Sequence, residues 1–260
     1  MKKRKTLYIH WFLFQIISLK RIVITAVILT VLCCLKCLST SINMPYDSII
    51  YGFWGYGNGG FSVSEFIGTL IVNRIPVYYI AIFLSEERQS KSSYIIIRMK
   101  KLRNWFWQFQ IAVSVVILMY LGLYVILNGL FPKLIGLNGD GSVIRELYHI
   151  IGADIEYPAL EIFISALLRY LEIMVWQMVL VCTFSLRKNI MAAFISLLTL
   201  NIFNIIALPW WYPIGISSIQ RYRLSANLTE DALVVGGILF LVYVTGCIYM
   251  KQKGLEKLFD

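Results

Sequence analysis

Six long apolar segments occupy most of this 260-residue chain, and they constrain its fold more than any other feature. Hydrophobic residues make up 59% of the sequence and charged residues only 15%, whereas soluble domains carry about 25% charged residues. A helix needs about 20 apolar residues to cross the hydrocarbon core of a bilayer. We therefore expect an all-α, polytopic membrane protein with a single transmembrane domain over residues 1–260. Its six spans are expected near residues 22–38, 66–84, 108–130, 159–184, 190–208 and 232–250.

The distribution of basic residues predicts the orientation of these spans. With both termini in the cytoplasm, 17 of the 24 lysines and arginines lie on the cytoplasmic side and four on the external side. Cytoplasmic loops of membrane proteins carry such an excess of basic residues. The net charge of +10 therefore indicates membrane orientation rather than nucleic-acid binding. We expect a multi-pass protein of a bacterial plasma membrane.

The first 21 residues form a separate unit in this prediction. The apolar stretch at residues 8–19 is too short to cross about 30 Å of hydrocarbon, and basic residues lie on both sides of it. Residues 1–21 are therefore expected to form an interfacial helix, an elbow that returns to the cytoplasmic face before the first span.

The cytoplasmic connection at residues 85–105 combines acidic, aromatic and basic side chains. It opens with Glu86 and Glu87 and closes on four cations around a short apolar run. Two interpretations are open. The segment either contacts a cytosolic partner, or it is a basic loop that fixes topology and holds lipid headgroups. Its candidate contact residues are Glu86, Glu87, Arg88, Tyr94, Arg98, Lys100, Lys101 and Arg103.

Three charged residues fall inside the predicted spans. Arg74 lies near the middle of the second span, two residues before Pro76, so we expect it to face protein or water next to a kinked helix. Arg169 and Glu172 are three residues apart in the fourth span and share one helical face. They are either a buried, self-neutralised pair or part of a substrate path.

The sequence lacks the motifs of common enzyme classes. It has two histidines, His10 and His149, and no HExxH, GxSxG or Walker motif. The five cysteines fall in or beside apolar segments and are expected to be small apolar packing residues rather than metal ligands. Glu86-Glu87 resembles the paired glutamates of CPBP-type intramembrane proteases, but the histidines that this family needs in its later spans are absent. We expect a protein that is not an enzyme and holds no metal.

The order of these features resembles the membrane subunit of ABC-2 type ABC exporters. A short amphipathic helix precedes the first span, and the second span leads into Glu86-Glu87-Arg88. The basic and aromatic sequence IRMKKLRNWFW precedes the third span, and a re-entrant or surface segment near residues 208–231 precedes the last. Arg74 and the Arg169/Glu172 pair have no counterpart in this pattern.

The resemblance implies a permease subunit without its own ATPase site. A separate cytosolic ABC ATPase would bind the ATP and Mg²⁺, so this chain itself would need no cofactor. Residues 85–105 would be the coupling helix, and a second permease copy or a similar subunit would complete the pore. The implied activity is export of a hydrophobic or amphipathic compound such as a peptide antibiotic. The alternative is a membrane protein that confers immunity to a bacteriocin or antibiotic, or senses one, and transports nothing.

Overall fold

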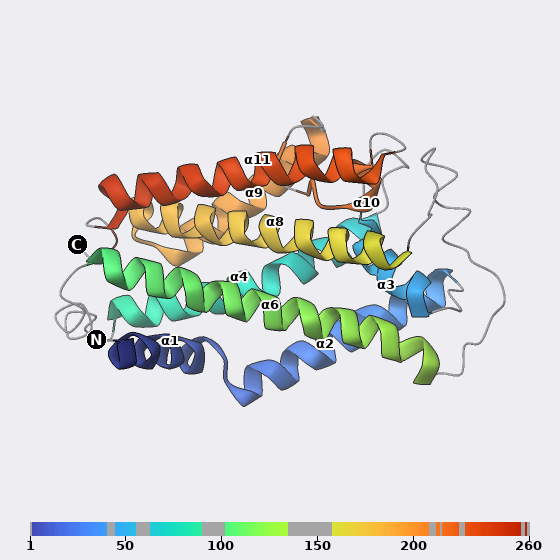
Figure 1. Cartoon of the computed structure of the whole chain (residues 1–260), viewed down its shortest axis with the longest axis horizontal. Helices are drawn as coiled ribbons and strands as arrows, with labels where there is room; N and C mark the ends of the chain where they lie inside the picture. The colour runs from blue at the N-terminus through green and yellow to red at the C-terminus, as the bar shows by residue number, and fades with distance from the viewer. Residues whose placement is uncertain are drawn as a thin grey trace.

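The computed structural model describes a bundle of helices that run roughly parallel to one long axis (Figure 1). The described residues are 2–40, 45–55, 63–89, 102–134, 158–207, 212–213, 215–223, 227–255 and 258. Every regular element within them is helical. The elements are α1 (Lys2–Ile16), α2 (Leu19–Thr40), α3 (Pro45–Trp54), α4 (Val63–Gln89), α6 (Leu102–Leu134), α8 (Pro158–Arg187), α9 (Ile190–Ala207), α10 (Ile219–Tyr222) and α11 (Leu228–Tyr249), which continues as the π-helical turn η1 (Met250–Gly254).

Four of the described helices are long and apolar enough to cross a membrane, namely α4, α6, α8 and α11 with η1. A fifth span is obtained only if α1 and α2, which meet at a bend of 54°, count as one broken span. The helix α9 is not counted as a span, because the part of it whose side chains the structure describes, Ile190–Phe203, extends only about 21 Å at 1.5 Å per residue. The structure therefore supports a multi-pass helical protein with four or five spans, and the predicted number of six is not confirmed.

The two ends of the bundle differ in the segments they gather. The start of α1, the end of α4, the start of α6, the α8–α9 turn and the end of α11 all lie at one end (Figure 1). Arg103, Arg187, Lys188, Lys251 and Lys253 lie at this end. The α3 helix and the starts of α4, α8 and α11 lie at the other end.

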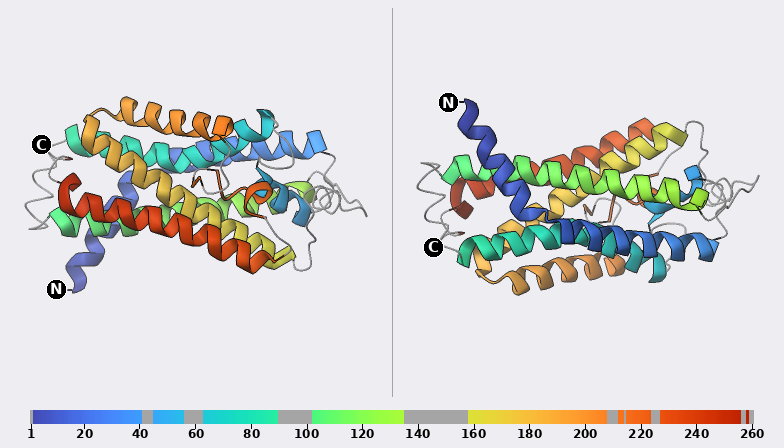
Figure 2. Two further views of the ribbon diagram at one scale, coloured as in Figure 1. Left: turned by 90° about the horizontal axis from the view of Figure 1, so that it is seen from above. Right: turned by 90° about the horizontal axis from the view of Figure 1, so that it is seen from below.

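The N-terminal elbow is a packed element of the bundle. The helix α1 points obliquely away from the bundle axis (Figure 2), and the break before α2 falls at residues 17–18. Phe12 is buried against Phe83 of α4 and against Trp105 and Phe109 of α6. Arg21 donates from Nη1 to the carbonyl oxygens of Gln15 and Ile16, at 2.9 Å each, and so satisfies the last turn of α1.

The helices α4 and α6 extend beyond the predicted second and third spans. Residues 85–89 continue α4, and residues 102–105 begin α6, so both ends of the predicted coupling region are parts of long helices. Residues 90–101 lie outside the described part of the chain. The helices α4 and α6 are longer than the predicted spans because a helix can continue through polar residues outside the hydrocarbon.

Pro76 lies inside α4, where the sequence predicts a kink, and α4 is bent along its length (Figure 1). Proline has no N–H, so the carbonyl of Val72, four residues earlier, loses its helical partner. The Tyr120 hydroxyl of α6 donates to this carbonyl at 2.6 Å. The kink is thus satisfied from a neighbouring helix, as backbone groups inside a membrane must be.

Candidate functional site: a buried polar network

Glu172 is the centre of a polar network inside the apolar bundle. Its side chain is fully buried on α8. One carboxylate oxygen accepts hydrogen bonds from the Gly215 backbone N–H at 2.8 Å, the Trp176 indole N–H at 3.1 Å and the Asn73 amide at 3.2 Å. The other oxygen accepts from the Ser217 backbone N–H at 3.0 Å. A carboxylate accepts hydrogen bonds only, so these four donors match its chemistry.

Asn73 connects Glu172 to Arg169. The Arg169 guanidinium, also buried, donates to the Asn73 side-chain oxygen at 3.0 Å and to the Phe53 carbonyl at 3.4 Å. Asn73 donates its own amide hydrogen to Glu172. The predicted pair therefore shares a helical face and is buried, but its two charges are linked through an amide of α4. Arg169 fixes α3 and Glu172 fixes the segment that contains Gly215.

Arg74 faces protein, as the sequence predicts for a charge within a span. Its guanidinium carbon lies 3.8 Å from the centre of the Trp176 ring, and its Nη2 donates to the Leu197 carbonyl of α9 at 2.8 Å. The stacking on Trp176 is a cation–π contact, which contributes most when it is desolvated. Arg74 thus links α4, α8 and α9 beside the Glu172 network.

Residues 215–223, between α9 and α11, return into the bundle and contact this network, and we call them the return segment. Residues 215–223 are all buried, and they include the short helix α10. Gly215 has φ = +77°, which turns the chain so that two nearby N–H groups face Glu172. Gly55, with φ = +67°, lies so close to Ser218 that a Cβ atom on it would be 2.2 Å from the Ser218 hydroxyl.

Two further carboxylates, those of Glu161 and Glu65, accept hydrogen bonds from the return segment. Tyr222 donates to Glu161 at 2.6 Å and also bonds Ser165, and Arg223 Nε lies 4.0 Å from the same Glu161 oxygen. Burial raises the pKa of Tyr222 well above its usual value, and the Glu161 carboxylate raises it further, so Tyr222 keeps its proton. Gln220 donates to the Gly55 carbonyl at 3.3 Å and to Glu65 at 3.5 Å.

Glu65 also accepts a hydrogen bond from Tyr51 of α3, at 3.0 Å. Burial raises the pKa of the Tyr51 hydroxyl, and the neighbouring Glu65 adds to the shift. The Lys36 ammonium of α2 lies 5.6 Å from the Tyr51 ring centre. These contacts tie α2, α3 and α4 to the return segment.

A small polar cavity of about 10 Å³ adjoins the network and is lined in part by Thr69, Asn73, Glu172 and Asn201. A cavity of this size is just sufficient for one water molecule, and its polar wall offers the partners that a water needs.

The predicted partner-contact residues fall into three groups. Glu86 is exposed and forms an ion pair with Arg21 at 3.8 Å, whereas Glu87 is buried and faces the Trp105 side chain. Arg103 is exposed at the start of α6. For Arg88 the structure describes the backbone at the end of α4 but not the side chain, and Tyr94, Arg98, Lys100 and Lys101 lie outside the described residues.

Arg103 contributes to a basic groove. The groove lies at the same end of the bundle as the start of α1. The groove has a volume of about 180 Å³, and Lys251 and Lys253 of η1 lie in its wall with Leu102 and Leu255. A π-helical turn of this kind is frequent at functional sites. The sequence identified Arg103 but assigned no role to the two lysines.

Among the residues that the structure describes, no three His, Cys, Asp or Glu side chains are grouped closely enough to hold a metal ion. The polar network is an anchor that fixes a backbone segment inside apolar surroundings.

Sequence reasoning missed Asn73, Trp176 and the backbone N–H groups of Gly215 and Ser217. Asn73 is adjacent to Arg74 in the sequence, and a polar dipeptide within a span is a usable signal. The backbone donors carry no side-chain signal, although Gly215 follows Pro209 and Pro213 in the sequence, and prolines are common just after the end of a helix.

No family model, no curated protein and no solved structure matches this chain.

Proposed function

We propose that this chain is the permease subunit of an ABC exporter, of the ABC-2 type. A separate cytosolic ATPase would bind and hydrolyse ATP, and two permease subunits would form the pore. The observation that carries the proposal is the buried return segment at residues 215–223, which is held by Glu172 and Glu161 of α8 and, through Gln220, by the Gly55 carbonyl. The sequence pattern of an ABC-2 permease has a re-entrant region at this position in the chain.

The architecture at the opposite end of the bundle supports the same function. The elbow α1, the end of α4 and the start of α6 are packed together through the ring cluster around Phe12. A force applied at the end of α4 or at the start of α6 would therefore reach the elbow through packed aromatic side chains. This rigidity is what a coupling helix needs to convert movement of an ATPase into movement of spans.

The basic groove of Arg103, Lys251 and Lys253 supports a contact with an acidic partner surface. Complementary charge speeds association and selects the partner more than it adds affinity. The exposed Arg103 would face the ATPase, whereas the buried Glu87 would not.

An open groove between α2, α4 and α9 supports a hydrophobic or amphipathic substrate. Its volume of about 730 Å³ is within the range of small-molecule sites, about 300–1,000 Å³. Its wall is mostly apolar, with Arg74 among the few charged residues. In this proposal the groove belongs to the substrate path, and Arg74 orients a polar group of the substrate.

Co-purification from mildly solubilised membranes tests the proposal. The wild-type chain is expected to retain an ATP-binding subunit. Changing Arg98, Lys100, Lys101 and Arg103 to Glu is expected to abolish that retention. Lys133→Glu with Arg145→Glu, on the predicted external side, is the matched control and should retain the ATPase. A wild-type chain that brings down no ATPase would contradict the proposal and would favour an immunity or sensing role.

A further inference from the structure

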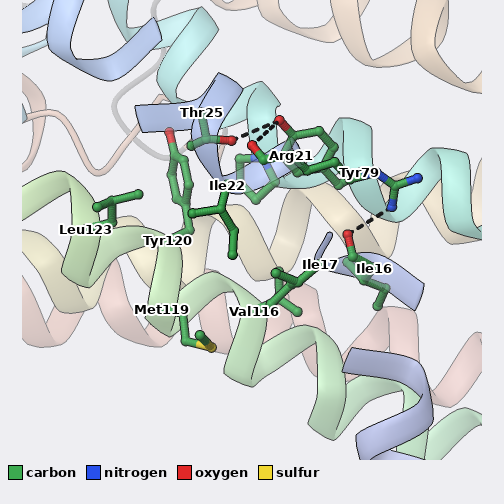
Figure 3. Close-up of a pocket in the computed structure, with 11 residues that line it drawn as sticks. Ile16, Ile17, Arg21, Ile22, Thr25, Tyr79, Val116, Met119, Tyr120 and Leu123 are labelled. Carbon is green, nitrogen blue, oxygen red and sulfur yellow. Dashed lines mark hydrogen bonds between the residues drawn. The ribbon is translucent and has the colours of Figure 1, made fainter. Parts of the chain in front are cut away.

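An apolar cavity lies where the bend between α1 and α2 faces the kink of α4 (Figure 3). Its volume is about 230 Å³. This exceeds the 150 Å³ or so that holds a benzene molecule and falls short of a typical drug-sized site. The apolar side chains in its wall come from the elbow, α2, α4 and α6, namely Ile16, Ile17, Ile22, Pro76, Val116, Met119 and Leu123.

The polar groups in the wall bond one another. The Tyr79 hydroxyl donates to the Arg21 carbonyl at 3.1 Å and lies 2.8 Å from the Thr25 hydroxyl (Figure 3). The Arg21 guanidinium donates to the Ile16 carbonyl at the end of α1 and forms an ion pair with Glu86. The Tyr120 hydroxyl donates to the Val72 carbonyl. A polar ligand group in this cavity would lose its water without gaining a partner, so the occupant is apolar.

The cavity opens toward the bilayer and not toward the interior of the bundle. Met119 in its wall is 56% exposed, on the outer side of α6. From Val116 to Leu123 the wall follows α6 for about 10 Å. At its shallow end lie the bend and Arg21, and the adjacent Lys20 of α2 is exposed in the wall of the neighbouring groove between α2, α4 and α9. An apolar slot that starts beside basic residues matches a lipid whose chain enters the slot and whose headgroup carries negative charge.

We infer that this cavity holds one acyl chain of an anionic phospholipid from the cytoplasmic leaflet, with the lipid phosphate at Lys20. The lipid fills the angle between the elbow and α2, where protein side chains leave a gap. The inference does not depend on transport, because it uses only the elbow, the kink and the charge at the membrane surface.

Photo-cross-linking of the full chain in lipid nanodiscs tests the acyl-chain contact. The probe is phosphatidylglycerol with a diazirine in its acyl chain, and adducts are mapped by mass spectrometry. Adducts are expected within residues 116–123 and 16–25. Met119→Trp, which fills the opening, is expected to lower their yield about threefold or more. Leu118→Trp is the control, because Leu118 is exposed on the same helix and does not line the cavity.

Competition between lipids tests the headgroup contact. One basic residue near a membrane surface contributes about a fivefold preference for anionic lipid. Lys20→Gln should therefore lower competition by unlabelled phosphatidylglycerol about fivefold and leave competition by phosphatidylcholine unchanged. Lys133→Gln should change neither. Equal competition by both lipids in the wild-type chain would overturn the inference. Absence of lipid adducts within residues 116–123 and 16–25 of the wild-type chain would also overturn it.

Discussion

Glu172 is the residue on which the buried polar network depends. Its two oxygens accept four hydrogen bonds, two of them from the backbone of the return segment. In Glu172→Gln, an amide N–H would replace one acceptor oxygen and leave a buried donor without a partner. Such a loss costs about 1–3 kcal/mol. The apparent melting temperature in detergent should fall by several degrees.

Glu230→Gln provides the matched control for this prediction. Glu230 is an exposed acid at the start of α11 and accepts a hydrogen bond from its neighbour Asn227. Its replacement should leave the melting temperature nearly unchanged. Equal effects of the two substitutions would show that Glu172 does not anchor the return segment.

Gly55 is the second residue on which the return segment depends. Its positive φ and its approach to Ser218 both exclude a side chain. Gly55→Ala should lower stability by about 1–3 kcal/mol and increase hydrogen exchange at residues 215–223. Gly122→Ala on the exposed face of α6, where a Cβ meets nothing within 4 Å, should be neutral or stabilising. A tolerated Gly55→Ala would refute the close packing described here.

At the scale of helices, the kink of α4 and the hydroxyl of Tyr120 should be coupled. Tyr120→Phe leaves the Val72 carbonyl without its donor and should cost about 1–3 kcal/mol. In a Pro76→Ala background the new alanine restores a backbone N–H that can bond this carbonyl, so the same change should cost about 1 kcal/mol less. Thermal unfolding of the two single variants and the double variant in detergent measures the coupling.

Tyr124→Phe is the control for this double-mutant cycle. Tyr124 donates to the Gly52 carbonyl at 2.7 Å, away from the proline. Its cost should be the same with and without Pro76. Additive effects of Tyr120→Phe and Pro76→Ala would contradict the coupling.

A second prediction at the scale of helices concerns the docking of the elbow α1 through Phe12. Phe12 is fully buried among four aromatic rings, whereas Phe14, two residues later on the same helix, is 79% exposed. Phe12→Ala should cost about 3–5 kcal/mol locally and release α1, seen as faster hydrogen exchange at residues 9–16. Phe14→Ala should leave that exchange unchanged. Fast exchange in the wild-type elbow would show that α1 is not docked.

Local patterns predicted the helical elements but not how they connect in space. The apolar segments indicated α4, α6, α8 and α11, and Pro76 indicated the kink, because both signals are contained within a few neighbouring residues. The burial of Arg74, Arg169 and Glu172 followed from the cost of a charge in hydrocarbon. The partners of Glu172 did not follow, since Asn73 and Ser217 come from positions 99 and 45 residues away.

The predicted count of six spans is not confirmed for a related reason. Hydropathy measures apolar length, but the path of a helix depends on its packing. The α1–α2 unit bends by 54° between basic residues, and α9 is described with its side chains only over Ile190–Phe203, which is too short for a span. The basic flanks of residues 8–19 indicated the elbow, but hydropathy gives no signal for the angle at which α1 meets α2.

On the scale of the whole molecule, the two ends of the bundle carry different features. One end gathers the elbow, the basic groove, the end of α4 and the start of α6, and the other end sends the return segment into the bundle (Figure 1). In the proposed function, an ATPase acting at the first end would move α4 and α6. The Glu172 network on α8 would link these movements to the return segment through Asn73 of α4.

The most direct test is ATP hydrolysis by material purified through an affinity tag on this chain and transferred into lipid nanodiscs. We predict that ATPase activity co-elutes with the chain, with one ATPase subunit for each permease subunit, and that the activity is lost when Arg98, Lys100, Lys101 and Arg103 are changed to Glu. A purified, folded chain that carries no ATPase subunit and hydrolyses no ATP would contradict the central claim.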